Sequence, residues 1–159
     1  MTDPEKQEHV KPTVVQKSLR AVIEMLHDGH KGFADIGHAL QDGEAKRFFL
    51  QETQTRSEFA AELENELHRM GVHDVKEGGT VAGAIHRAWG DLKAKISSGD
   101  HTLLETAEQG EDVAKKAYEE ALKEKLPAPI REILTKQQSH ILEAHNKVKA
   151  LRDSKAAAA

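Results

Sequence analysis

The stretch "GVHDVKEGGTVAGAIHRAWGDLKAKISSGD" (Gly71–Asp100) decides the fold, because it is the long connection in a chain of otherwise closely joined helices. Its first part, "GVHDVKEGG", breaks the helical pattern that precedes it. A short helix is then predicted from Thr80 to about Ser97. Its apolar stripe consists of Val81, Ile85, Ala88, Trp89, Leu92 and Ile96. "SSGD" stops this helix, and Asp100 is a good N-cap for the next one.

Four long helices are predicted around this connection. Apolar residues recur every three or four positions over residues 13–40, 43–70, 101–125 and 128–152. "QDG" separates the first two segments, and "LPAP" separates the last two, since proline is excluded from a helix interior. Residues 1–12 are expected to form a flexible tail and residues 153–159 a frayed end, which leaves one domain over residues 13–152.

The spacing of these helices predicts an all-α, ferritin-like four-helix bundle. Two antiparallel hairpins are joined by roughly 30 residues, enough to travel back along a bundle about 37 Å long at 1.5 Å per residue. One long crossover of this kind distinguishes ferritin-like connectivity from a simple up-down-up-down bundle.

Composition excludes several classes of protein. The chain has 159 residues, no cysteine and a net charge of −4, so it has no disulfide framework, no zinc ribbon and no basic stripe for nucleic acid. No apolar run approaches the roughly 18 residues of a membrane span. Ser-His-Asp, P-loop and dinucleotide motifs are also missing. The expected location is therefore the cytoplasm of a bacterium-like cell.

A small set of polar residues is predicted to face the core, and we call it the polar layer. On a projection of 100° per residue, these side chains lie within roughly 45° of the apolar stripes or on their flank. The set is His30, Glu52, Arg56, Glu111, Gln137 and His140. Counting from the helix ends brings all six to about the same height. Four helices therefore contribute polar groups to one level near the middle of the bundle.

Two interpretations of the polar layer stay open. In one, Arg56 hydrogen-bonds Glu52 on its own helix and Glu111 across the bundle, with Gln137 nearby, and no cofactor is expected. In the other, Glu52, Glu111, His30 and His140 bind iron or manganese, as the carboxylates and histidines of ferritin-like di-iron proteins do. The literal Glu24-x-x-His27 motif points away from the stripe and is expected at the surface.

The remaining histidines are expected at flanks or in loops, in solvated or half-buried positions. They are His27, His38, His68, His73, His86, His101 and His145. No catalytic residue is predicted among them.

Several motifs resemble a bacterial family of uncharacterised ferritin-like four-helix-bundle proteins. They are "DGHKGF" (Asp28–Phe33), Arg56 with "SEFAAEL", "GGTVAGAIHRAW" (Gly78–Trp89), "EQGEDVAKKAYEEAL" (Glu108–Leu122) and "LPAPIREIL". The resemblance extends from about Val14 to Leu151. It implies the ferritin-like fold and a bacterial cytosol, and it brings no activity with it.

Three functional hypotheses follow. The first is a non-catalytic bundle protein, a homodimer with a role in stress, that binds a protein partner through Phe48, Leu50 and Leu122 and contacts neither nucleic acid nor membrane. The second is an iron- or manganese-binding protein with oxidase or peroxide-related activity. The third is a pH sensor that uses His30 in the core.

Overall fold

The computed structural model describes residues 11–72, 89–90 and 92–158. Within these residues the secondary structure is helical, and no strand occurs. The helices are α2 (Pro12–Ala39), α3 (Gly43–Arg69), α5 (Leu92–Lys95), α6 (Asp100–Leu122) and α7 (Ala128–Ala158). The all-α prediction is therefore confirmed for the described part of the chain. None of its helices combines the length and the apolar character needed to cross a membrane.

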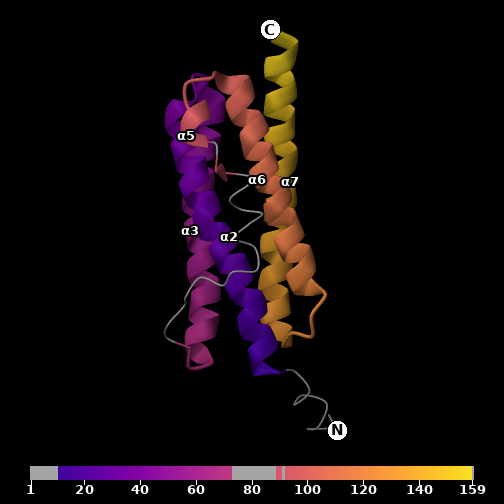
Figure 1. The fold of residues 1–159 in the computed structure, drawn as a ribbon. Coiled ribbons are helices and arrows are strands. Elements are labelled where there is room, and N and C mark those ends of the chain that lie inside the picture. The colour runs from indigo at the N-terminus through magenta and orange to yellow at the C-terminus, as the bar shows by residue number, and fades with distance from the viewer. Residues whose placement is uncertain (1–10, 73–88, 91, 159) are drawn as a thin grey trace.

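Four long helices run side by side, and Figure 1 shows their directions. α2 and α3 form one antiparallel pair, and α6 and α7 form another; α2 also packs against α6. α3 ends at the opposite end of the bundle from the start of α6. α3 and α6 therefore run in the same direction, as the long connection predicted.

The connections between helices are set by local chemistry. The carboxylate of Asp42 accepts a hydrogen bond from the backbone N–H of Ala45 at 2.9 Å and caps the start of α3. At the other end of α3, Gly71 has a φ of 84°, which glycine adopts without steric cost. The N–H of Gly71 donates to the carbonyl of His68 and that of Val72 to Leu67, which is a Schellman ending.

Asp100 has a different role from the one predicted. Gly99 is the N-cap of α6, and the carboxylate of Asp100 accepts the backbone N–H groups of Gln41 and Asp42 at 2.8 and 2.9 Å. It therefore ties the start of α6 to the turn between α2 and α3. The prediction of Asp100 as N-cap was wrong because a neighbouring turn offers its donors to the same side chain.

Two ends differ from the predicted boundaries. α6 stops at Leu122, where Arg131 donates to the carbonyls of Leu122 and Glu124. α7 continues to Ala158, six residues beyond the expected end, and projects past the other helices in Figure 1. Ala is the strongest helix former; Arg152 pairs with Glu108 of α6, and Lys155 pairs with Asp42 in the α2–α3 turn. Most of the short helix predicted over residues 80–97 lies outside the described residues; α5 occupies part of the remainder.

The core consists of two apolar clusters stacked along the bundle. One contains Leu19, Leu26, Leu63, Leu67, Tyr118, Leu134 and Ile141, among others. The second, nearer the α2–α3 turn, contains Phe33, Ile36, Phe49, Leu103, Leu104, Val148 and Leu151, among others. Along α3 and α6, the buried Glu52, Arg56 and Glu111 lie where the two clusters meet.

Candidate functional site

The predicted polar layer lies inside the bundle. Glu52 and Arg56 of α3, Glu111 of α6 and Gln137 of α7 are all buried, with exposed fractions of 3%, 1%, 0% and 2%. Each faces the core because it falls on the apolar stripe of its own helix, one or two turns from buried apolar residues on either side. Their inward orientation, predicted from the helical projection, is confirmed.

Arg56 is the centre of the layer. Its Nη1 lies 2.7 Å from Oε1 of Glu111, and its Nη2 donates to Oε2 of the same carboxylate at 2.9 Å. Its Nε donates to Oε2 of Glu52 at 3.2 Å, one turn earlier on α3. The planar guanidinium thus uses all three nitrogens and joins α3 to α6 through a buried ion network.

The charges of the network determine the state of Arg56. Burial alone would lower the pKa of Arg56, but the charge and hydrogen bond of Glu111, followed by the charge of Glu52, raise it above its ordinary value. The guanidinium also lies over the ring of Phe33, with Cζ 4.7 Å from the ring centroid. Arg56 is therefore a permanent cation held by two carboxylates and an aromatic face.

His140 extends the network to the surface. Its Nε2 lies 2.7 Å from Oε1 of Glu52, and its side chain is 36% exposed while that of Glu52 is 5% exposed. The imidazole contacts the ring of Phe59 edge to face, with the two ring centroids 5.3 Å apart. Glu52 therefore receives one contact from Arg56 inside the bundle and one from His140 at its edge.

A second polar link joins α6, α7 and α3. The hydroxyl of Tyr118 donates to Oε1 of Gln137 at 2.7 Å, and Nε2 of Gln137 donates to Oε1 of Glu62 at 2.8 Å and to the carbonyl of Phe59 at 3.3 Å. Burial raises the pKa of Tyr118 far above its usual value, so the phenol stays protonated. Tyr118 was not among the residues predicted to form the polar layer, although a buried tyrosine needs a partner for its hydroxyl.

The four candidate metal ligands do not all converge. Glu52, Glu111 and His140 gather around Arg56, whereas Nδ1 of His30 donates to the backbone carbonyl of Thr53 at 2.9 Å. His30 is half-buried, one turn of α2 before Phe33. Among the described residues, no group of three or more His, Asp or Glu side chains has an arrangement that could hold a metal ion.

The Glu24-x-x-His27 motif is divided between core and surface. Glu24 is 7% exposed, which corrects the expectation that it lies outside, while the side chain of His27 is 56% exposed and pairs with Glu64 at 2.6 Å. α2 packs against both α3 and α6, so its buried arc is wider than one stripe and includes five successive residues from Val22 to Leu26. A projection of the isolated helix underestimates such an arc.

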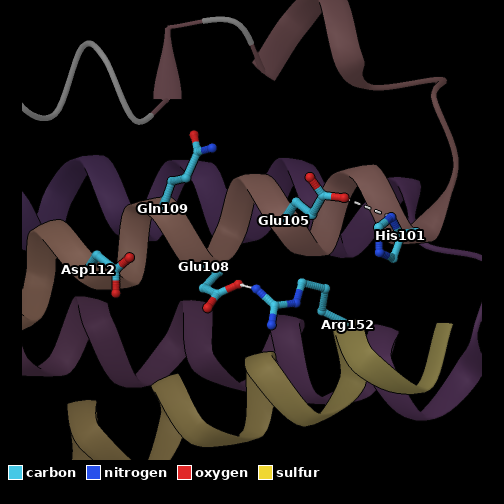
Figure 2. Close-up of a pocket in the computed structure, with 6 residues that line it drawn as sticks. All are labelled: His101, Glu105, Glu108, Gln109, Asp112 and Arg152. Atoms are coloured by element: carbon cyan, nitrogen blue, oxygen red, sulfur yellow. Dashed lines mark hydrogen bonds and ion pairs between the residues drawn. The ribbon is translucent and has the colours of Figure 1, made fainter. Parts of the chain in front are cut away.

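Other histidines pair at the surface, as at the cleft shown in Figure 2. This cleft, of about 400 Å³, lies on α6 beside the C-terminal half of α7. It is lined by His101, Glu105, Glu108, Gln109, Asp112 and Arg152. Two of its carboxylates have partners within the cleft: His101 pairs with Glu105 at 2.8 Å, and Glu108 points toward Arg152 and pairs with it. His145 lies 2.9 Å from Asp112. His73 and His86 lie outside the described residues.

Comparison with known families identifies one match. The model of a domain of unknown function, DUF2383, covers residues 14–124. The chain belongs to this family. Among curated proteins, no match is found. The part matched to DUF2383 includes α3 and α6, and with them Glu52, Arg56, Glu111 and Tyr118; Gln137 and His140 lie on α7, beyond the matched residues.

Proposed function

We propose that the chain is a ferritin-like four-helix-bundle protein that acts by binding rather than by catalysis. In this proposal the Glu52–Arg56–Glu111 network stands where metal-binding ferritin-like proteins hold a pair of ions. One observation carries it: a guanidinium that is 1% exposed places two nitrogens 2.7 and 2.9 Å from the two oxygens of Glu111.

The course of the chain supports the ferritin-like assignment. α2 and α3 run antiparallel, α6 and α7 run antiparallel, and α3 ends at the opposite end of the bundle from the start of α6, so the connection between the two pairs has to be long. Ferritin-like bundles have one such long crossover, and their sites are built from side chains on facing helices near the middle. The position of Glu52, Arg56 and Glu111 between the two apolar clusters supports this comparison.

The chemistry of the layer supports a site without metal. Iron and manganese need carboxylate and imidazole lone pairs that are not already engaged by another cation. Here Arg56 contacts both carboxylates, and its charge cannot be removed by deprotonation at accessible pH. The network thus gives each of the two buried carboxylates a protein cation as partner.

The second candidate is an iron- or manganese-binding protein with oxidase or peroxide-related activity. The observation that favours it is the contact of 2.7 Å between His140 and Glu52, because a carboxylate and an imidazole from two helices are a ligand pair of the kind such sites use. Metal binding through this pair and Glu111 would require Arg56 to leave both carboxylates.

Metal loading separates the two candidates. Protein purified without chelator is incubated with Fe(II) or Mn(II), passed over a desalting column and assayed for bound metal by mass spectrometry. We expect no stoichiometric metal. About two ions per chain, lost in Glu52→Gln and Glu111→Gln but kept in the surface control Glu119→Gln, would establish the second candidate instead.

The Arg56→Leu variant gives an independent readout. It leaves Glu52, Glu111 and His140 in place without their cation, so Mn(II) should raise its melting temperature while leaving that of the wild type unchanged. A rise of the same size in both proteins would refute the idea that Arg56 takes the place of a metal.

A homodimer, a bacterial cytoplasmic location and a role in stress are further parts of the proposal, and the family resemblance supports only the bacterial cytoplasm. The predicted contact residues Phe48, Leu50 and Leu122 are each half-buried. Among described residues, the exposed large apolar side chains are Ile96 and Leu142. Sedimentation equilibrium tests the dimer, and Leu142→Lys should weaken it if α7 forms the contact.

A further inference from the structure

The indole of Trp89 lies against a glycine on each of two helices, Gly32 on α2 and Gly110 on α6. A Cβ built on Gly110 of α6 would lie 2.0 Å from Cζ2 of Trp89, and one built on Gly32 of α2 would lie 2.5 Å from Cε3. Nonbonded carbon atoms keep about 3.5–4.0 Å apart. Alanine at either position would therefore displace the indole. The two glycines form a seat for this ring because they lack side chains.

The indole also contacts the aromatic ring that covers Arg56. The ring centroids of Trp89 and Phe33 are 5.9 Å apart, and Cζ of Arg56 is 4.7 Å from the centroid of Phe33. Phe33 is fully buried, whereas Trp89 is partly exposed. Trp89, Phe33 and Arg56 thus form a continuous path of contacts from the surface to the polar layer.

Trp89 is at the height of the polar layer. It packs against both apolar clusters, which meet at that layer, and its glycine neighbour on α6 directly precedes Glu111. On the α3–α7 side the layer reaches solvent through His140. On the α2–α6 side the partly exposed indole packs on Phe33, the ring that contacts Arg56.

We propose that Trp89 is a lid that seals the α2–α6 side of the polar layer, and that its seat is a binding site for one planar aromatic ring. Trp89 belongs to none of the four long helices, and those helices contact one another directly. Displacing the indole therefore leaves the contacts among those helices in place. Its departure admits water beside Arg56, where a higher local dielectric weakens the ion network.

The chain offers a direct test, because Trp89 is its single tryptophan. Gly110→Ala removes the space for the indole. Gly29→Ala is the matched control on α2, since a Cβ at Gly29 meets nothing within 4 Å. We expect Gly110→Ala to shift the fluorescence emission of Trp89 to the red and to increase its quenching by acrylamide. Hydrogen exchange at Nε–H of Arg56 should become about tenfold faster. The far-UV circular dichroism spectrum should stay the same. Gly29→Ala should change none of these.

Two outcomes would overturn the proposal. If Gly110→Ala leaves the emission of Trp89 unchanged, the seat does not hold the indole. If the emission shifts and exchange at Arg56 does not, the indole does not seal the layer.

Trp89→Ala tests the same seat without adding a clash, and it serves if Gly110→Ala does not fold. Its exchange at Arg56 should be faster than in the wild type, and added indole should slow it again by filling an apolar slot. An exchange rate equal to that of the wild type, or one that indole does not change, would contradict the proposal.

Discussion

Arg56→Met is the most informative single substitution, because it removes the cation and keeps most of the volume of the side chain. Arg56 contacts Glu52 and Glu111, whose side chains are 5% and 0% exposed, so the variant leaves two buried carboxylates without their common partner. Breaking a buried ion pair by removing one member costs about 3–5 kcal/mol. A domain of this size is stable by about 5–15 kcal/mol, so the variant loses a large part of its stability.

Urea unfolding followed by circular dichroism measures this loss. The midpoint should move to lower urea with the slope unchanged, and the Tm should fall by roughly 6–20 °C. Lys116→Met, at an exposed position of α6, is the control and should stay within about 0.5 kcal/mol of the wild type. A loss below about 1 kcal/mol for Arg56→Met would refute the assignment of a buried ion network.

A compensated variant isolates charge from packing. Glu52→Gln, Arg56→Met and Glu111→Gln together remove every formal charge of the network. If uncompensated charge causes the loss, the triple variant should recover more than half of it. If the triple variant is less stable than Arg56→Met alone, the defect lies in packing and hydrogen bonding instead.

Three further predictions concern other contacts. Gln137→Leu should lower the free energy of unfolding by about 1–3 kcal/mol, because the buried hydroxyl of Tyr118 loses its acceptor. The double variant with Tyr118→Phe should lose less stability than the two single variants added together. Additive losses would contradict the hydrogen bond. Asp100→Ala should destabilise by about 1–2 kcal/mol, since the N–H groups of Gln41 and Asp42 lose their acceptor, with Asp153→Ala as the surface control in the same urea titration. The N–H of Ala45, followed by Lys155, lowers the pKa of Asp42 below its usual range, so the stability that Asp42 contributes is present above about pH 4 and is lost as pH falls through the lowered pKa. In thermal melts between pH 2 and 6, the wild type should therefore have a higher Tm than Asp42→Asn near pH 6, and this Tm difference should shrink towards pH 2. A Tm difference that does not change with pH would refute the role of the Asp42 carboxylate.

The central network could be predicted from the sequence because it depends on two simple quantities. The angular position of Glu52, Arg56 and Glu111 follows from the helical period, and their common height follows from counting residues from the helix ends. Both quantities are set by the chain locally. The contact between Arg56 and Glu111 therefore followed once the direction of each helix was known.

The features that sequence reasoning missed depend on neighbours. Glu24 is buried because α2 has two packing partners, and Asp100 leaves its capping role because the α2–α3 turn lies beside it. The seat of Trp89 is formed by Gly32 on α2 and Gly110 on α6, which are 78 residues apart in the chain and contact the same indole. None of these follows from the period of a single helix.

The division of the core into two apolar clusters by charged residues fixes how the helices align along their axes. The apolar stripe of α7 repeats, so a shift of one turn, about 5.4 Å, would still place Ile or Leu side chains in apolar surroundings. The same shift would bring Ile133 or Ile141 opposite Tyr118 in place of Gln137 and leave the buried hydroxyl of Tyr118 without its partner. Apolar packing alone tolerates such sliding, whereas this hydrogen bond does not. The buried polar contacts thus give a bundle of repetitive helices a single alignment.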